Sequence, residues 1–495
     1  MHRFYGERRH SLMLAAAAGA LVAAASLGTA GAAFAQAASA GLTPQEVEQL
    51  RADLAAVRAE AASARAADAE RERKIDAMQR QLATATGGAP PVEQIPAPAE
   101  GAKVARTEGG PNFEIYGFAQ LDFTQDFNRV DPAWDDALRP SKIPTTDGEF
   151  GSNGQNSISA KQSRFGIKGS QDIAGKPLEF KFEFDLFGVG VDAGQTTMRV
   201  RHFYASWGPI LAGQTNTNWM DIDIFPNTVE YWGPPGMVFL RNPQIRYTFK
   251  SDKNEFAIAL EKPSNDVDAG QIREFDPELG NSIQGHEDYP DLTGHWRYSD
   301  DWGHIQLGAI LRQVGFDSAG TPDNEPKGHK TGWGVNLTGN IKTWNKDTLH
   351  LGVVYGEGIA TYMNDGGVDL GPKGAPIVTQ PIGGGPVVIQ AGTLAPDVVP
   401  LLGLLIYYDH YWTDKFSTSL GWSETKVDNL SFQAPNAFQS GQYASINLLW
   451  APDKRILMGA EYIWGRREDH NGQSGQDNRI QASFKYSFSS NDFFK

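Results

Sequence analysis

Apolar and charged side chains alternate with a period of two residues in one segment after another from Phe113 onward. The clearest case runs from Leu178 to Leu186, where Leu or Phe at each even position alternates with Glu, Lys or Asp at each odd position. Because successive side chains of a β-strand point to opposite faces, this segment presents one apolar face and one charged face. A soluble sandwich would bury the apolar face in a protein core, whereas a membrane barrel turns it to lipid and turns the charged face to water.

Sixteen segments of this kind are expected to be strands, and the connections between them follow a pattern of their own. The segments lie near 113–127, 157–170, 177–187, 197–207, 210–215, 242–250, 255–261, 291–298, 302–316, 331–343, 348–360, 401–412, 415–427, 440–450, 455–466 and 478–488. Short turns and longer loops alternate between them, and only the loop near 188–196 is brief for its class. Outer-membrane barrels have short periplasmic turns and long external loops. The sequence therefore predicts an all-β transmembrane barrel of 16 antiparallel strands over residues 113–495.

Residues 1–35 have the features of a secretory signal peptide. A positive start is followed by a stretch rich in Ala and Leu, and Ala33-Phe34-Ala35 gives a small-x-small cleavage site. We expect cleavage near Ala35 and export of the remainder. A membrane anchor is the alternative, but the Ala-rich composition and the cleavage motif disfavour it. No other stretch is long and apolar enough for a spanning helix.

Residues 36–88 are predicted to form a periplasmic coiled-coil helix. Apolar residues in a 3-4 alternation mark its seam, and they include Val47, Leu50, Leu54, Val57, Ile75, Met78 and Leu82. Such a seam is buried by pairing with copies of itself or with another helix, so an oligomerisation stalk is expected. A lone helix lying on the barrel or on the cell wall is the alternative. Residues 89–112 are predicted to form a Pro-rich linker.

The composition and motifs argue against several kinds of function. The chain has no Cys, so a disulfide framework, a thiolate metal site and a Cys nucleophile are impossible. Its net charge of −15 argues against nucleic-acid binding. The sequence lacks the nucleotide-binding, zinc-protease and nucleophile-elbow motifs, and the run His286-Glu287-Asp288 is of a kind that is usually just solvated. We therefore expect no catalysis, no cofactor and no metal ion.

The connection 216–241 is the natural candidate for narrowing a barrel of this width. Half of its residues are apolar or aromatic, which is unusual for an external loop in water. We expect it to fold inward as a constriction loop, with Asp221, Asp223 and Glu230 facing the lumen. Packing of the loop at a contact between subunits is the alternative.

Strand alternation places basic residues on the lumen side opposite this loop. The candidates for a pore constriction that binds anions are Arg164, Lys168, Arg199, Arg201, Arg241 and Arg246. The assignment of Arg199 and Arg201 requires Val200 and His202 to point outward. Guanidinium groups in a water-filled constriction would hold carboxylates in bidentate pairs, which predicts a preference for anions. Alternatively, these arginines pair with Glu179, Glu183 and Asp185 of the adjacent strand and only hold the wall together.

Five segments resemble the DcaP-like trimeric outer-membrane porin family. They are YGFAQLD (116–122), SRFGIKG (163–169), RVRHFYASWG (199–208), LAGQTNTNWMD (211–221) and NPQIRYTF (242–249). The resemblance implies a homotrimer of sixteen-stranded channels in the outer membrane of a Gram-negative cell, with the N-terminal helix in the periplasm. It also implies passive uptake of small organic anions such as dicarboxylates.

Other functions remain open at this point. The alternatives are a phosphate-selective porin, a barrel that anchors a structural or cell-wall-tethering protein, and a barrel enzyme such as a phospholipase. The expected partners are further copies of the chain, outer-membrane lipid and small anionic solutes, and no nucleic acid is expected.

Overall fold

The computed structural model describes residues 112–188, 197–373, 377–379, 388–390 and 395–492. The chain divides into two units, Met1–Ala105 and Arg106–Lys495, and every described residue belongs to the second unit. The predicted signal peptide, coiled-coil seam and nearly all of the predicted linker lie outside the described residues. Within the described part, no helix has the length and apolar character needed to cross a membrane.

The second unit is built on one antiparallel sheet of 18 strands. The strands are β1 (Asn112–Asp126), β2 (Gln155–Ser159), β3 (Arg164–Ile173), β4 (Lys176–Asp185), β5 (Arg199–Trp207), β6 (Ile210–Asn216), β7 (Arg241–Ser251), β8 (Asn254–Glu261), β9 (Ile283–His286), β10 (Asp291–Asp300), β11 (Gly303–Ser318), β12 (Gly328–Lys342), β13 (Thr348–Glu357), β18 (Pro400–Tyr411), β19 (Phe416–Val427), β20 (Phe438–Asp453), β21 (Ile456–Asp469) and β22 (Ser474–Ser489). Apart from β2 and β9, each strand of this sheet pairs with the next strand of the sheet along the chain, and β1 also pairs with β22 from Tyr116↔Ser489 to Asp126↔Arg479. The sheet therefore closes on itself as a barrel.

Two pairs of strands share one position in the wall. β2 and β3 pair with different parts of β1, and β9 and β10 pair with different parts of β11. The wall thus has sixteen strand positions, and the prediction of a sixteen-stranded antiparallel barrel is confirmed. The predicted strand 157–170 divides between Ser159 and Arg164, where Ser163 Oγ accepts from Gln120 N at 3.0 Å and donates to Gln120 O at 3.2 Å. Its hydroxyl takes the place of a ladder partner there.

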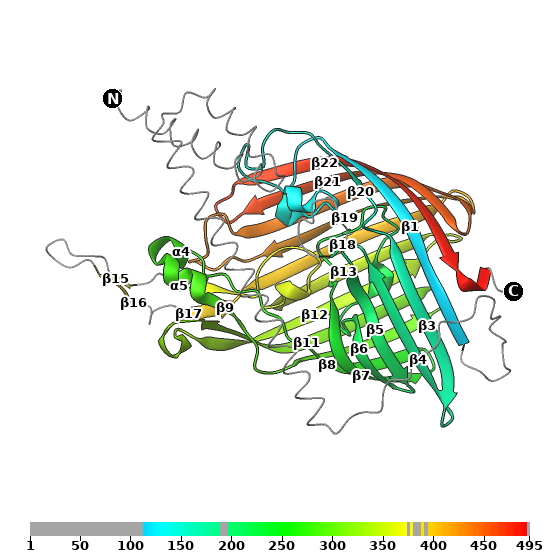
Figure 1. The fold of residues 1–495 in the computed structure, drawn as a ribbon, viewed down its shortest axis with the longest axis horizontal. Helices are drawn as coiled ribbons and strands as arrows, with labels where there is room; N and C mark the ends of the chain where they lie inside the picture. Colours follow the sequence, from blue (N-terminus) through cyan, green and yellow to red (C-terminus); the bar gives the residue numbers. More distant parts are fainter. Residues whose placement is uncertain (1–111, 189–196, 374–376, 380–387, 391–394, 493–495) are drawn as a thin grey trace, which may run out of the picture. The chain divides into compact units, whose positions relative to one another are not determined.

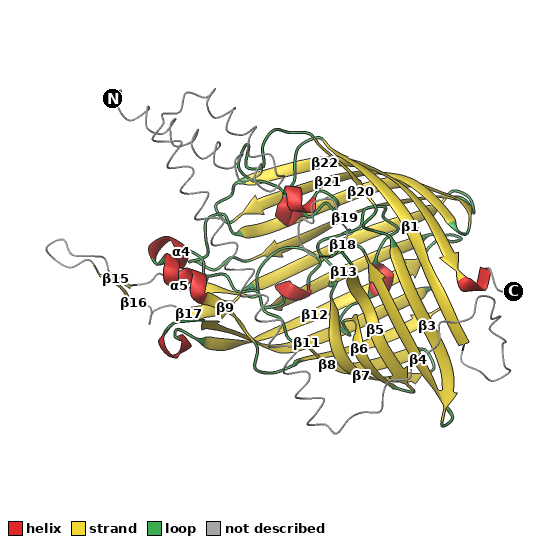
Figure 2. Cartoon of the chain, in the orientation of Figure 1, coloured by secondary structure: helices red, strands yellow, loops and turns green. Residues whose placement is uncertain are grey.

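The long connections carry the remaining elements. The loop after β8 contains α4 (Ile272–Phe275) and α5 (Pro277–Ser282). The loop after β13 contains β14 (Leu370–Lys373), β15 (Ile377–Thr379), β16 (Val388–Gln390) and β17 (Ala395–Val398). Figure 1 shows α4, α5 and β17 at the left end of the barrel, and η7 (Ser490–Asp492) follows β22 at the opposite end. Figure 2 shows that the described helices are short and lie in connections, while the wall consists of strands.

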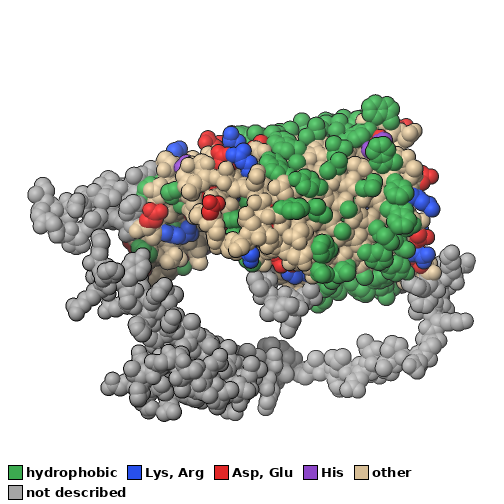
Figure 3. Space-filling model, turned by 90° about the horizontal axis from the view of Figure 1, so that it is seen from above, with side chains coloured by type: hydrophobic (Ala, Val, Ile, Leu, Met, Phe, Trp, Pro, Cys, Tyr) green, Lys and Arg blue, Asp and Glu red, His purple; other side chains and the backbone are tan. Residues whose placement is uncertain are grey.

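The two faces of the wall differ in the way that the alternation predicts. On β12, Trp333, Val335 and Leu337 are 39, 40 and 46% exposed, whereas the alternate residues Asn336 and Thr338 are each 3% exposed. Figure 3 shows the outward residues as a broad band of hydrophobic side chains, with charged groups gathered toward the ends of the barrel. We call this surface the outer apolar band. An apolar surface of this extent is stable only where lipid or another protein covers it.

The hydrophobic core lies inside the barrel. Its largest cluster joins Trp219 from the connection between β6 and β7 to Ile359 and Tyr362 from the connection after β13. The rings of Trp219 and Tyr362 are 5.8 Å apart and nearly perpendicular. Two long connections therefore fold into the lumen and pack against each other there.

A charge placed in the outer apolar band is expected to destabilise the barrel. Leu337 lies between Leu307 and Val353 of the adjacent strands, all three facing outward. Leu337→Arg should lower the free energy of unfolding by about 2–4 kcal/mol in a bilayer, because the guanidinium must enter hydrocarbon. Urea unfolding of the protein in phospholipid vesicles measures this, with Leu337→Phe as the apolar control. Equal stability of the two variants would contradict the lipid-facing assignment.

Candidate functional site in the barrel lumen

Residues 217–240, which connect β6 to β7, cross the lumen and are hydrogen-bonded to the wall along their length; we call them the lumen loop. Near its start, the side-chain nitrogen of Asn218 donates to the carbonyl oxygens of Ala257 and Thr293, each at 3.3 Å. Farther along, Asn447 of β20 donates to the Asn227 carbonyl at 2.7 Å. Close to its end, Gly236 N donates to Ser423 Oγ of β19 at 2.9 Å. The loop is therefore attached to strands on several sides of the barrel.

Trp219 fixes the first part of the lumen loop. Its side chain is fully buried, and its indole lies against Gly308 of β11 and Gly334 of β12. A Cβ atom at either glycine would come within 2.8 Å of the indole. The absence of a side chain at these two positions lets the ring lie directly on the wall, where its burial stabilises the inward fold of the loop.

Asp221 attaches the lumen loop to the wall instead of lining an open passage. It is 2% exposed and accepts hydrogen bonds from His304 Nε2 and Thr338 Oγ1, both at 2.7 Å. Burial favours the neutral acid, but these hydrogen bonds and the charge of Arg297 hold the pKa of Asp221 below its usual value. Asp223 also pairs with Arg297 and is the more exposed of the two aspartates.

Glu230 is also buried, and its carboxylate accepts from the backbone nitrogens of Leu138 at 2.9 Å and Gly233 at 2.6 Å. Burial raises the pKa of this carboxyl group. Of the three acidic residues expected to face the lumen, Glu230 borders a cavity of the lumen although it is buried, whereas Asp221 is turned to the wall, so the expectation is wrong for Asp221. The side chains of Asp221 and Glu230 satisfy buried donors that the inward fold would otherwise leave unpaired.

Among the described residues, one group has ligand atoms close enough for a metal ion. Asp221, Asp223 and His304 each offer an atom within 4.8 Å of the others. The guanidinium of Arg297 already pairs with both aspartates, at 3.4 Å from Asp221 Oδ1. An arginine thus supplies the positive charge that a metal ion would bring, and we assign no metal to this group.

A β-bulge on β5 turns two neighbouring side chains toward the lumen. Glu183 of β4 faces His202, but the next residue, Phe184, faces Val200, so Arg201 is the extra residue. Arg201 and His202 are each 8% exposed, while Val200 and Phe203 are 43 and 66% exposed on the outside. The expectation that His202 points outward is therefore wrong, because the bulge shifts the alternation by one residue.

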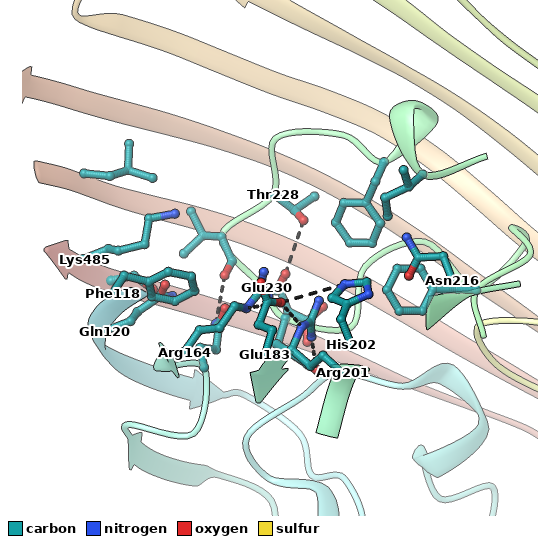
Figure 4. Close-up of a pocket in the computed structure, with 18 of the residues that line it drawn as sticks. Phe118, Gln120, Arg164, Glu183, Arg201, His202, Asn216, Thr228, Glu230 and Lys485 are labelled. Atoms are coloured by element: carbon teal, nitrogen blue, oxygen red, sulfur yellow. Dashed lines mark hydrogen bonds and ion pairs between the residues drawn. The ribbon is translucent and has the colours of Figure 1, made fainter. Parts of the chain in front are cut away.

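Two carboxylates of β4 form ion pairs with the basic side chains near the bulge. Asp185 Oδ2 is 2.7 Å from Arg199 Nη2 and 2.8 Å from Arg201 Nη1. Glu183 lies 2.9 Å from Arg201, 3.2 Å from Lys181 and 3.5 Å from Arg164. Figure 4 shows Arg164, Glu183, Arg201 and His202 grouped on the wall. The alternative in which these arginines pair with β4 carboxylates thus describes their contacts, although the cations outnumber the carboxylates.

Two cavities open along this side of the lumen. The inner cavity, of about 650 Å³, is bordered by residues of the strands and of the lumen loop, and its charged lining residues are Arg164, Lys181, Glu183, Arg201, Glu230 and Lys485. The outer cavity, of about 510 Å³, is bordered by residues of the long connections, and its charged lining residues are Arg139, Arg199, Arg241, Asp266 and Asp365. Tyr231 and Phe239 of the lumen loop line both cavities.

Tyr231 is held firmly at the boundary between the cavities. Its ring stacks on Phe187 with centroids 3.9 Å apart. Its hydroxyl donates to Asp185 Oδ2 at 2.8 Å and accepts from Arg201 Nη1 at 3.1 Å. The ion-paired cluster that contains Asp185 and Arg201 therefore also holds the Tyr231 ring at the boundary between the inner and outer cavities.

Two of the predicted basic residues line neither cavity. Lys168 pairs with Glu114 at 3.0 Å. Arg246 donates to Gln244 Oε1 at 2.9 Å and to the Asn216 carbonyl at 2.6 Å. Both are inward-facing, but neither lies among the lining residues of the inner or the outer cavity.

Three basic lining residues were absent from the sequence-based set. Lys181 and Lys485 lie on inward positions between outward aromatic residues, so the strand alternation contains the signal for both. Arg139 lies in a long connection, between the rings of Trp134 and Trp232 at 4.4 and 4.3 Å from their centroids, and it pairs with Asp365 at 2.8 Å. No periodicity in the sequence points to it.

Several solved structures are similar to this chain, to different degrees. The crystal structure of the outer membrane channel DcaP of Acinetobacter baumannii is similar with a TM-score of 0.62 and 20% identity, covering 78% of this chain and 99% of that chain. An anion-selective porin from Comamonas acidovorans matches with a TM-score of 0.46 and 10% identity, covering 77% of this chain and 100% of its own. OmpT, an outer membrane protein of Vibrio cholerae, matches with a TM-score of 0.46 and 10% identity, covering 78% and 100%.

No curated protein sequence matches the chain. The model of the family described as DcaP outer membrane protein matches residues 107–366, which is more than half of the chain. The chain therefore belongs to the DcaP outer membrane protein family.

Proposed function

We propose that this outer-membrane porin is a passive channel that prefers small organic anions, dicarboxylates among them. The surplus of basic over acidic side chains around the two cavities carries the proposal. Four basic and two acidic residues line the inner cavity, and three basic and two acidic residues line the outer one. The four predicted residues among these cations, Arg164, Arg199, Arg201 and Arg241, lie along the proposed anion path together with Lys181 and Lys485.

A local surplus of positive charge can select anions even though the whole chain carries −15. Charges that line a narrow space with low-dielectric walls focus the potential there and raise the local concentration of counter-ions. Acidic residues elsewhere are screened by water and salt over distances beyond about 8–10 Å. Selection of this kind needs several weak contacts, so that a solute enters readily and also leaves.

The kind of cation favours carboxylates over phosphate. Five of the seven basic residues that line the cavities are Arg and two are Lys. The planar fork of Arg matches the two oxygens of a carboxylate. We therefore place a phosphate-selective porin second, since that function would favour a lumen richer in Lys. A barrel that only anchors the cell wall is distinguished by the absence of ion conduction.

We also propose that the lumen loop is the constriction and that the channel is a homotrimer with a periplasmic coiled-coil arm. Burial of Trp219 and the hydrogen bonds of Asn218, Asn447 and Gly236 support a loop that stays inside the barrel. The apolar seam within residues 47–82 supports self-association. Native mass spectrometry of the detergent-purified protein tests the trimer.

Charge selectivity is the most direct test of the solute class. In a potassium chloride gradient across a planar bilayer, the reversal potential should have the sign of chloride preference. Arg201→Gln should shift it toward cations, because Glu183 and Asp185 then lose a shared partner. Arg246→Gln, which removes an inward guanidinium outside both cavities, should shift it less. A cation preference in the wild-type channel, unchanged in both variants, would refute the proposal.

The width of the passage should depend on Tyr231. Tyr231→Ala removes the ring that borders both cavities, so the single-channel conductance should rise. Tyr231→Phe keeps the ring against Phe187 and should stay near the wild-type conductance. If the conductance of Tyr231→Ala equals that of Tyr231→Phe, the lumen loop does not set the narrowest point.

A further inference from the structure

We infer that Arg241 in the outer cavity and Lys485 in the inner cavity are the two stations at which an anionic solute is held during its passage. The inference rests on the proposed function and assigns the binding of the solute to two particular side chains. These two cations differ from the other basic residues that line the cavities, whose charges are paired with carboxylates.

Every other basic residue that lines a cavity is engaged by a carboxylate. Arg139 pairs with Asp365 at 2.8 Å, and Arg199 pairs with Asp185 at 2.7 Å. Glu183 is shared by Arg164, Lys181 and Arg201. These charges are largely balanced by contacts within the wall, and a solute would have to compete with a carboxylate already in place.

Arg241 and Lys485 differ from the rest in this respect. Within the described ranges, neither side chain has an acidic oxygen within 4.0 Å, and neither takes part in a side-chain hydrogen bond. The charge of each is therefore available to a solute. One such cation lines each of the two cavities.

An aromatic ring positions each of these cations without neutralising it. The guanidinium carbon of Arg241 lies 5.0 Å from the centroid of Phe239, and Nζ of Lys485 lies 5.0 Å from the centroid of Phe118. A ring face attracts a cation through its quadrupole and leaves the net charge in place. Figure 4 shows Lys485 beside Phe118 on the inner cavity. The two cations are thus held in place for a ligand that is not part of the wall.

The boundary between the cavities separates the two stations. Arg241 lines only the outer cavity and Lys485 only the inner one, while Tyr231 and Phe239 line both. Phe239 is also the ring on which Arg241 rests. A carboxylate that enters from the long loops meets Arg241 first, passes this aromatic boundary, and then meets Lys485. Two sites in series keep each contact weak enough for release.

The test uses the full-length channel in a planar bilayer, with succinate added to one chamber as a blocker of the chloride current. Arg241→Gln and Lys485→Gln should each raise the half-blocking succinate concentration by about tenfold or more, the effect of losing one charge-assisted contact. The two variants should act mainly on block from opposite chambers, because the stations lie on opposite sides of the boundary.

Matched variants remove the same charge elsewhere in the lumen. Arg246→Gln removes a guanidinium from β7, the strand that also carries Arg241. Lys168→Gln removes an inward lysine that already pairs with Glu114. In both variants the half-blocking succinate concentration should stay within about twofold of the wild-type value, well below the tenfold rise expected for Arg241→Gln and Lys485→Gln. Heat-modified mobility in gels and the formation of open channels in the bilayer show that each variant has folded.

The outcomes separate this inference from the proposed function. If succinate blocks the wild-type channel and all four variants behave alike, the stations are wrong and anion selection by the whole lumen stands. If Arg241→Gln and Lys485→Gln weaken block from the same chamber equally, the arrangement in series is wrong. If the wild-type channel is neither blocked by succinate nor selective for chloride, the proposed function itself fails, and the inference fails with it.

Discussion

The pairing of β1 with β22 closes the wall, and the other features of the molecule depend on that closure. An open sheet would leave a row of unpaired backbone groups at each edge, which cannot be tolerated in lipid. The two strands pair from Tyr116↔Ser489 to Asp126↔Arg479. At the far end of the seam, fully buried Arg479 donates to both carboxylate oxygens of Asp126, through Nε at 2.5 Å and Nη2 at 2.9 Å. A bidentate ion pair therefore links the first strand to the last.

The junction of β1 with β22 is also linked to the lumen loop. Arg479 also donates to the carbonyl of Asp135 in the loop after β1, at 2.9 Å. Three residues farther along, Leu138 N donates to Glu230 of the lumen loop. A wall with its polar face inside offers hydrogen-bond partners to such loops, whereas a soluble barrel would fill this space with apolar side chains. The wall, with its polar face inside, thus provides hydrogen-bond partners for the lumen loop and charged side chains for the cavities.

Much of the fold could be predicted because period two is a strong signal when one face meets lipid. All sixteen strand positions follow from the alternation, and the inward placement of Arg164 and Arg246 follows from their neighbours. A one-residue β-bulge cannot be recognised from the alternation of apolar and polar residues, so the direction of the His202 side chain could not be predicted. The roles of Asp221 and Glu230 were also inaccessible, because they depend on donors from distant segments, His304 and Leu138 among them. Alternation could have found Lys485, but nothing local distinguishes a paired cation from a free one.

The central claim is that the inner face of this wall meets water and the outer face meets lipid. The chain has no Cys, so single cysteines can be placed on neighbouring positions of β22 without background. In the protein reconstituted into vesicles, a small water-soluble thiol reagent should modify Lys485→Cys quickly and leave Phe484→Cys and Tyr486→Cys unmodified. Equal modification at the three positions, or modification at 484 and 486 with protection at 485, would contradict the account.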